Sequence, residues 1–114
     1  MKKVKISKPW GYEKILEHNK KYVLKKLFMK KGHRCSLQYH NKKIETIYIL
    51  KGKLRIKYGK SIKRISSKIF NQDDIITINP KIIHRMEAIN NSIYLEASTP
   101  ELNDVVRLND DYKR

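Results

Sequence analysis

Hydrophobic and polar residues alternate along most of this chain, in short runs separated by polar turns. The clearest run is 53–58, in which Leu54, Ile56 and Tyr58 alternate with basic residues. Successive side chains of a strand point to opposite sides, so this alternation predicts strands with one buried and one solvated face. The runs that we interpret as strands are 12–17, 22–30, 36–40, 45–49, 53–58, 62–70, 75–78, 82–88 and 93–97.

The spacing of these runs predicts the fold class. Strands recur about every 8–12 residues with turns between them, a spacing typical of sandwiches and barrels. No segment has a convincing helical period. Residues 1–11 form a lead-in that ends at the turn Pro9-Trp10-Gly11, and an acidic tail with short ordered segments follows Pro100. We therefore expect an all-β domain.

Side chains with metal-binding chemistry gather in residues 32–52. Gln38 and His40 share one face of the first strand of this stretch, and Glu45 begins the second strand after a polar turn. If the two strands pair across that turn, these side chains converge, and His84 from a later segment supplies a fourth ligand. An amide oxygen, imidazoles and a carboxylate suit a divalent ion that accepts nitrogen and oxygen ligands, such as Zn, Fe, Mn, Ni or Co.

The order of these residues resembles the two sequence motifs of the cupin superfamily. The first motif, Gly-x5-His-x-His-x3,4-Glu-x6-Gly, is matched over residues 32–52, with Gln38 in the position of the first His. The second motif, over about residues 73–88, keeps its Pro and His as Pro80 and His84, whereas its Gly and Asn are replaced. The resemblance implies a jelly-roll barrel, or double-stranded β-helix, with one metal ion held by Gln38, His40, Glu45 and His84.

Further stretches resemble one branch of this superfamily, the C-terminal domain of type II mannose-6-phosphate isomerases and its short stand-alone relatives. These stretches are the opening Lys8-Pro9-Trp10-Gly11-Tyr12-Glu13, the run Ser36-Leu37-Gln38-Tyr39-His40 and the closing segment 98–114. The resemblance implies one cupin domain over 1–114 that interconverts mannose 6-phosphate and fructose 6-phosphate, in polysaccharide or nucleotide-sugar biosynthesis.

The run Lys43-Ile44-Glu45-Thr46-Ile47 departs from that branch, because it lacks the Arg, His and Trp usual around the acidic ligand. Two alternatives therefore stay open. One is another cupin enzyme acting on an activated sugar, for example an epimerase. The other is a non-catalytic cupin that binds a sugar and keeps its metal.

An isomerase of this kind needs a base and groups that bind phosphate. We predict Glu96 as the base, because it shares a strand face with Tyr94 and an acidic residue there fits the family pattern. A salt bridge on a barrel strand is the alternative role for this carboxyl group. The resemblance favours Arg107 as a second catalytic side chain and as the phosphate ligand. Further phosphate-binding candidates are Arg85, Arg114, Lys26 and Lys43.

The charge of the chain bears on its partners. It carries 27 basic and 11 acidic residues, a formal net charge of +16, but residues 77–114 hold 5 basic and 6 acidic side chains. The excess therefore lies in the first two thirds, mostly as lysine. We find no nucleic-acid-binding motif and few aromatic residues among the basic ones. We expect solvated, lysine-rich strand faces that attract a sugar phosphate or nucleotide sugar, and no nucleic-acid partner.

Three further expectations concern compartment and assembly. The only cysteine, Cys35, excludes an intrachain disulfide and fits a reducing cytoplasm, where we expect it to be a packing residue. No apolar run is long enough to cross a membrane. The resemblance implies a homodimer, with Leu37, Tyr39 and the N-terminal strand as interface candidates.

Overall fold

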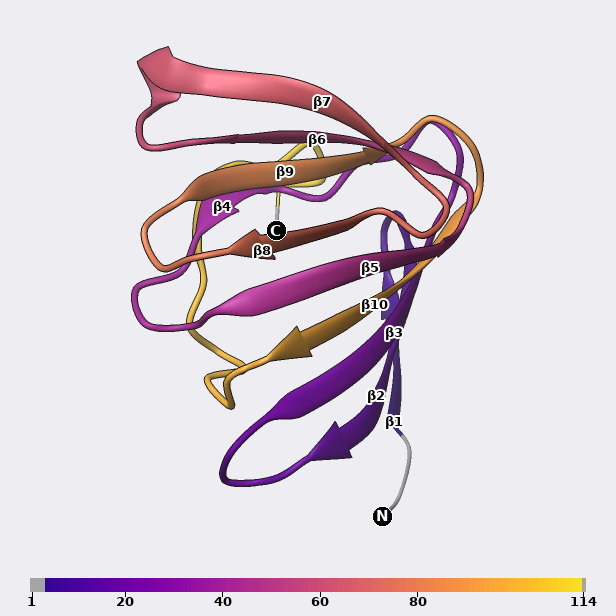
Figure 1. Ribbon diagram of the computed structural model, residues 1–114, viewed down its shortest axis with the longest axis vertical. Helices are drawn as coiled ribbons and strands as arrows, with labels where there is room; N and C mark the ends of the chain where they lie inside the picture. The colour runs from indigo at the N-terminus through magenta and orange to yellow at the C-terminus, as the bar shows by residue number, and fades with distance from the viewer. Residues whose placement is uncertain (1–3, 114) are drawn as a thin grey trace.

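The computed structural model describes residues 4–113, which fold into two facing antiparallel β-sheets (Figure 1). The larger sheet contains β1 (Val4–Lys8), β2 (Gly11–His18), β3 (Val23–Met29), β5 (Glu45–Lys51), β8 (Ile75–Ile78) and β10 (Ser92–Ser98). The smaller sheet contains β4 (Leu37–Tyr39), β6 (Lys53–Gly59), β7 (Ile65–Asn71), β9 (Ile83–Ala88) and β11 (Val106–Asn109). The strand orders are β1-β2-β3-β10-β5-β8 and β11-β4-β9-β6-β7. The predicted all-β jelly roll is confirmed.

A hydrophobic core fills the space between the two sheets. In β3, Val23, Leu27 and Met29 are buried while alternate residues are partly exposed, as the pattern of the sequence predicts. Inward residues of both sheets meet in this way. The core includes Trp10, Cys35, Ile47, Ile49, Leu54, Ile56, Met86 and Tyr94. Cys35 is thus a packing residue, as expected.

Strands also form in the lead-in and in the closing segment, for which short ordered segments were expected. The lead-in contains β1, which pairs with β2, and the closing segment contains β11, which pairs with β4. Conversely, residues 62–64 were expected to begin a strand and instead form a 3-10 turn (η1, Ile62–Arg64), so that β7 begins at Ile65. Within residues 4–113, no helix is long and apolar enough to span a bilayer.

The predicted pairing of the two strands on either side of residues 41–43 is wrong. β4 pairs with β9 and β11 in the smaller sheet, whereas β5 pairs with β8 and β10 in the larger sheet. The residues between them cross from one sheet to the other instead of closing a hairpin. The crossing nevertheless brings His40, just after β4, close to Glu45, the first residue of β5.

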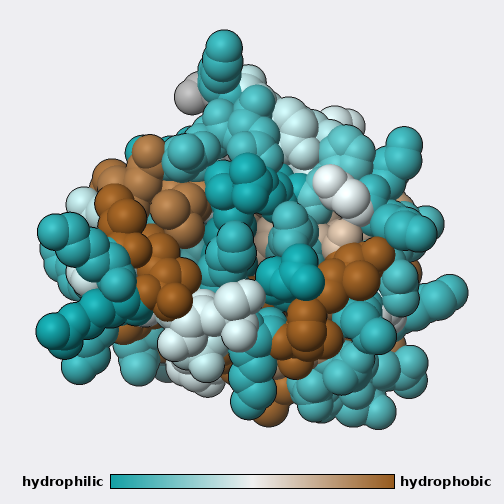
Figure 2. Space-filling model, turned by 90° about the horizontal axis from the view of Figure 1, so that it is seen from above, coloured by the Kyte–Doolittle hydropathy of each residue, from teal (hydrophilic) through white to brown (hydrophobic). Residues whose placement is uncertain are grey.

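Basic residues occupy many outward positions. In β6, Lys53, Arg55 and Lys57 are partly exposed, whereas the intervening Leu54 and Ile56 are buried. Figure 2 shows hydrophilic residues over most of the face that it displays, with hydrophobic residues in separate groups. This arrangement agrees with the expectation of solvated strand faces.

Candidate metal centre

His40, Glu45 and His84 meet between the two sheets. One ligand atom from each lies within 4.8 Å of the others. Nε2 of His40 is 3.2 Å and Nε2 of His84 is 2.9 Å from Oε1 of Glu45. All three side chains are buried. The structure therefore brings together three of the four predicted metal ligands, two from the first motif and one from the second.

A main-chain carbonyl fixes the other nitrogen of each imidazole. Nδ1 of His40 donates to the carbonyl oxygen of Asp104 at 2.5 Å, and Nδ1 of His84 donates to that of Ile82 at 2.9 Å. A carbonyl oxygen only accepts, so both Nδ1 atoms carry the proton, and a neutral ring then directs an Nε2 lone pair toward Glu45. Hydrogen bonds of this kind orient metal-binding histidines in other proteins.

The protonation of the two rings leaves acceptors facing one another. Nε2 of His84 is buried and has no hydrogen-bond partner among residues 4–113. If both rings are neutral, two imidazole lone pairs and a carboxylate oxygen converge without a donor between them, which is unfavourable unless a ring gains a proton or a metal ion binds. The donor set fits a divalent ion that accepts nitrogen and oxygen ligands.

A buried ammonium group lies behind this cluster. Nζ of Lys43 is 3.5 Å from Oε2 of Glu45 and 3.1 Å from Oε2 of Glu96. Burial disfavours the charged form of Lys43, but the two carboxylates raise its pKa. Burial likewise opposes ionisation of Glu45, yet hydrogen bonds from His40 and His84, donated when their Nε2 atoms carry a proton, and the charge of Lys43 lower the pKa of this carboxyl group well below its usual range. Lys43 therefore joins the candidate metal ligand to a second carboxyl group.

Gln38, the remaining predicted ligand, lies beside the cluster. It pairs with His84 in the β4–β9 register and lines the adjoining cavity. Its Oε1 accepts a hydrogen bond of 2.6 Å from the hydroxyl of Ser36. An amide oxygen has two lone pairs, so this hydrogen bond leaves one of them for a metal ion. Its place in the metal site stays a prediction.

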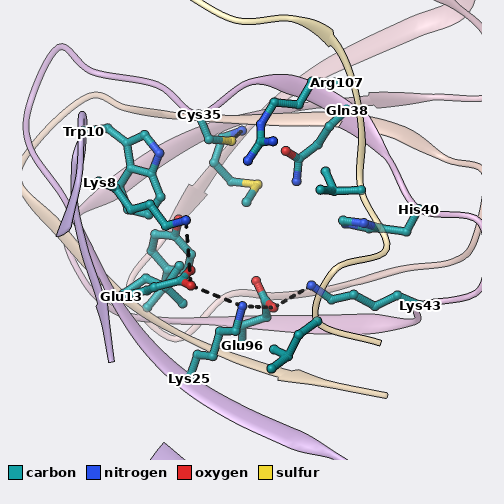
Figure 3. Close-up of a pocket in the computed structure, with 15 residues that line it drawn as sticks. Lys8, Trp10, Glu13, Lys25, Cys35, Gln38, His40, Lys43, Glu96 and Arg107 are labelled. Carbon is teal, nitrogen blue, oxygen red and sulfur yellow. Dashed lines mark hydrogen bonds and ion pairs between the residues drawn. The ribbon is translucent and has the colours of Figure 1, made fainter. Parts of the chain in front are cut away.

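A cavity of about 110 Å³ adjoins the cluster (Figure 3). His40 and Lys43 lie at one end of it, and Trp10 and Glu13 lie at the opposite end. Both sheets contribute side chains that line the space between these ends, among them Lys8, Lys25, Gln38, Glu96 and Arg107. The cavity thus leads away from the candidate metal ligands between walls rich in charge.

The two predicted catalytic residues line this cavity. Glu96 is 5% exposed, and burial together with the charge of Glu45 raises its pKa, although Lys43 and Lys25 oppose the shift. Arg107 is exposed, and its side chain forms no hydrogen bond or ion pair within the described part of the chain. A buried carboxyl group and an available guanidinium group therefore border the same space.

Of the other phosphate-binding candidates, Lys43 lines this cavity, whereas Arg85 and Lys26 do not. Arg85 is 6% exposed, and it donates from Nε to the carbonyl of Cys35 and from Nη2 to the carbonyl of Asn109. Its donors are thus engaged by the main chain, outside the cavity lining. Lys26 is on the outward face of β3. Arg114 lies outside the described residues.

Asp104, which the sequence analysis missed, holds the turn beside the candidate metal ligands. Its carboxylate accepts hydrogen bonds of 2.7–3.0 Å from the backbone N–H groups of Asn41, Lys42 and Lys43. These bonds, those from Asn41 and Lys42 above all, lower the pKa of Asp104 to about 2. Its carbonyl oxygen accepts from His40 as well. One residue of the closing segment therefore shapes the turn and orients a candidate ligand.

Sequence reasoning also missed Glu13 and Lys25, two buried charged residues of the cavity wall. Lys25 carried a local signal, because it is the only charged residue on a strand face otherwise formed by Val23, Leu27 and Met29. A charge on an apolar face marks a position where the core opens onto a polar site. Glu13 is on β2, where the alternation is weaker and gives no comparable signal.

Comparison with known families and structures agrees with this description. The model of the family "Mannose-6-phosphate isomerase C-terminal" matches residues 1–110. KdgF from Halomonas sp. superimposes with a TM-score of 0.75 at 13% identity, over 88% of either chain. A search of curated proteins gave no significant match.

Two longer proteins also contain this fold. The capsular polysaccharide assembling protein CapF from Staphylococcus aureus superimposes with a TM-score of 0.81 at 13% identity, over 96% of this chain and 32% of CapF. Oxalate decarboxylase from Bacillus subtilis gives a TM-score of 0.82 at 16% identity, over 93% of this chain and 30% of the decarboxylase. The chain spans about a third of each of these proteins. Identities this low show the fold alone.

Proposed function

Because the chain belongs to the mannose-6-phosphate isomerase C-terminal family of the cupin superfamily, we propose that it isomerises a phosphorylated sugar. The reaction moves a proton between C1 and C2 and so interconverts an aldose and a ketose, with mannose 6-phosphate and fructose 6-phosphate as the expected pair. The observation that carries the proposal is that the cavity beside the cluster of candidate metal ligands, which His40 lines, is also bordered by a buried carboxyl group and an available guanidinium group.

In this proposal His40, Glu45 and His84 hold a divalent ion, with Gln38 beside them as the fourth predicted ligand. Such an ion supplies Lewis-acid polarisation of the sugar oxygen on C1 or C2. The two carbonyl hydrogen bonds on Nδ1 keep the rings in the orientation that this role needs. Lys43 neutralises the second oxygen of Glu45.

Glu96 is the proposed base. It removes the proton from C2 of the aldose and returns it to C1, while the hydroxyl proton on O2 passes to O1 of the enediolate, and it does the reverse for the ketose. The raised pKa supports this role, since a base that accepts and then releases a proton works best when its pKa approaches the working pH. Lys43, 3.1 Å from Oε2, orients the carboxylate.

Arg107 is the proposed phosphate ligand, because a guanidinium group binds phosphate through two parallel hydrogen bonds. The size of the cavity further restricts the substrate. About 110 Å³ is small, since pockets for drug-sized ligands span roughly 300–1,000 Å³. A single sugar phosphate suits this space better than a nucleotide sugar.

The proposal includes a homodimer in the cytoplasm. Leu37 and Tyr39 are only partly buried on β4, so both have surface available for a subunit contact. Sedimentation velocity at micromolar concentration tests the assembly, and a monomer throughout the concentration range would contradict this part of the proposal.

The test of function compares metal content and isomerisation of mannose 6-phosphate in the parent protein and in His40→Ala/His84→Ala. We expect near-stoichiometric metal and activity in the parent and the loss of both in the variant. His18→Ala/His33→Ala is the matched control, since it also removes two imidazoles but leaves the cluster intact. In Glu96→Gln we expect retained metal and a kcat lowered by about 10²–10⁴-fold.

Other outcomes distinguish the remaining alternatives. A metal-loaded protein that leaves mannose 6-phosphate unchanged would contradict the isomerase and favour another cupin reaction on an activated sugar. A protein that takes up none of Zn, Mn, Fe, Ni or Co after reconstitution would overturn the metal-dependent mechanism and leave a binding module without a metal ion.

A further inference from the structure

A buried carboxylate and a buried ammonium group in the cavity wall form an ion pair that is too long for a hydrogen bond. Glu13 is 8% exposed and Lys25 is 7% exposed. Nζ of Lys25 lies 3.6 Å from Oε1 of Glu13 and 4.0 Å from Oε2 of Glu96, and Nζ of Lys8 lies 3.9 Å from the same oxygen of Glu13. Each distance exceeds the roughly 2.7–2.9 Å of a charge-assisted hydrogen bond.

Other ion pairs of this protein are closer. Arg55 and Glu87 approach to 2.8 Å on the outer face of the smaller sheet, and Lys43 and Glu96 approach to 3.1 Å inside the cavity. In contrast, the side chains of Glu13 and Lys25 make no hydrogen bond within the described part of the chain. Their hydrogen-bonding capacity is therefore unused on the protein side.

Burial of donors and acceptors that make no hydrogen bond costs free energy. Removing a carboxylate and an ammonium group from water is repaid only when their remaining donors and acceptors are satisfied. Both side chains line the cavity. Glu13 lies at the end opposite His40, and Lys25 lies between Glu13 and Glu96 (Figure 3). Groups that satisfy them must therefore enter through the cavity, as water or as parts of a ligand.

The carboxylate of Glu13 and the ammonium group of Lys25 together favour a hydroxyl group as their ligand. A hydroxyl oxygen accepts from an ammonium group while its proton is donated to a carboxylate, so a single hydroxyl serves both sides. A phosphate or carboxylate group would meet Glu13 with like charge, and an amine would meet Lys25 in the same way. We propose that Glu13 and Lys25 form a hydroxyl-binding subsite for the part of the sugar that does not react.

The sugar carbon concerned follows from the proposed function, on which this step rests. With C1 and C2 near His40 and the phosphate on C6 near Arg107, C3, C4 and C5 are left to reach Glu13 and Lys25. In the pyranose form C5 carries the ring oxygen, so the free hydroxyl groups are those on C3 and C4. A site built to bind a hydroxyl discriminates strongly against the deoxy sugar, because the buried polar groups then lose their partner. The subsite therefore sets specificity at C3 or C4.

The experiment uses Trp10 as a reporter that needs neither metal nor turnover. Trp10 is the only tryptophan of the chain and lines the same cavity. Its emission is followed while metal-free protein is titrated with mannose 6-phosphate or with the 3-deoxy or 4-deoxy derivative. We expect the parent sugar phosphate to bind at least about tenfold more tightly than one of the derivatives.

Two variants test whether Glu13 and Lys25 cause this difference in affinity. In Glu13→Gln and in Lys25→Met we expect mannose 6-phosphate to bind about 10–100-fold more weakly, and the difference between it and the deoxy derivative to disappear. Glu87→Gln and Lys57→Met are the matched controls, because they remove the same charges from the outer face of the smaller sheet. Glu13→Asp keeps the charge with a shorter reach, and it replaces Glu13→Gln if the latter does not fold by circular dichroism.

Each outcome separates this inference from the proposed function. Equal binding of parent and deoxy sugars, or full discrimination in both variants, overturns the subsite even where isomerisation is measured. A protein without isomerase activity whose discrimination is lost in the two variants keeps the subsite and loses the isomerase. Absence of binding by both fluorescence and calorimetry overturns the subsite.

Discussion

Asp104 connects the closing segment to the turn that carries the candidate metal ligands, 61 to 63 residues earlier in the chain. Three backbone N–H groups of that turn share its carboxylate, and His40 is bonded to its carbonyl oxygen. Removal of the carboxylate leaves the three donors to water and allows the turn to move. The main-chain carbonyl that accepts from His40 remains, but movement of the turn would change the position of the ring relative to it.

We expect Asp104→Ala to weaken metal binding by about 10–100-fold, the usual effect of losing a group that orients a ligand. Competition with a chromogenic chelator measures the affinity. Glu87→Ala is the control, because this carboxylate pairs with Arg55 on the outer face of the smaller sheet. Unchanged affinity in Asp104→Ala would show that the turn keeps its shape without the carboxylate.

Asp104 also makes a prediction about acid stability. The backbone N–H bonds lower its pKa from 3.8 to about 2. A carboxyl group with a lowered pKa in the folded state contributes stability above its unfolded pKa and loses that contribution as the pH falls through the folded value. Urea unfolding should therefore give a difference in the free energy of unfolding between the parent and Asp104→Ala that is constant above about pH 5 and becomes smaller toward pH 2. A difference that stays constant down to pH 2 would contradict this role.

Some residues of the candidate site can be predicted from the sequence and others cannot, for a physical reason. His40, Glu45 and His84 occupy motif positions, and their side chains meet as expected. Lys25 shows a local signal as a charge on an apolar strand face. Asp104 shows none, because its contacts join segments that only the folded chain brings together.

At the scale of elements, Gly52 controls the turn between β5 and β6. Its φ is +98°, and a Cβ added there would lie 2.4 Å from Oγ of Ser92 and 2.5 Å from the carbonyl oxygen of Asn91. The turn from β5 therefore passes directly against the start of β10. A side chain at this position meets both backbone strain and a collision.

We expect Gly52→Ala to lower the free energy of unfolding by at least ~1 kcal/mol more than Gly32→Ala. Gly32 is a matched control, since its φ is +82° but a Cβ there would have no atom within 4 Å. Urea unfolding of both variants separates the collision from the strain. Equal destabilisation would mean that the β10 start moves aside at little cost.

The strands themselves follow from the alternation, but their partners do not. The alternation does not give the bounds of β1 and β11, because both are edge strands and most of their residues are partly or fully exposed. The alternation shows which face of a strand is buried, but it does not show which strand lies next to it. The turn after β4 accordingly suggested a hairpin, whereas the chain crosses there to the opposite sheet.

At the scale of the whole molecule, the net charge of +16 acts on any anionic ligand. We expect the affinity for mannose 6-phosphate to fall by roughly three- to tenfold between 0.05 and 0.5 M NaCl, because salt screens the attraction. Titrations followed by Trp10 emission measure this change. Unphosphorylated mannose is the control, and an equal salt effect on it would contradict an electrostatic origin.

The candidate metal ligands come from both sheets. His84 lies in β9 of the smaller sheet and His40 directly follows β4 of the same sheet, whereas Glu45 begins a strand of the larger sheet. A divalent ion bound by all three would cross-link the two layers of the sandwich. Its binding energy would then become part of the folding energy, about 4 kcal/mol at a free concentration one thousand times the Kd.

Loading with zinc should therefore raise the Tm and slow amide hydrogen exchange at the facing ends of β4 and β5, but not in His40→Ala/His84→Ala. A Tm that is independent of the ion in the parent protein would show that the layers do not depend on it. A bound ion would therefore affect the stability of the fold as well as the chemistry of the site. In a chain with one cysteine, the ion would take the stabilising part that a disulfide plays in a secreted domain.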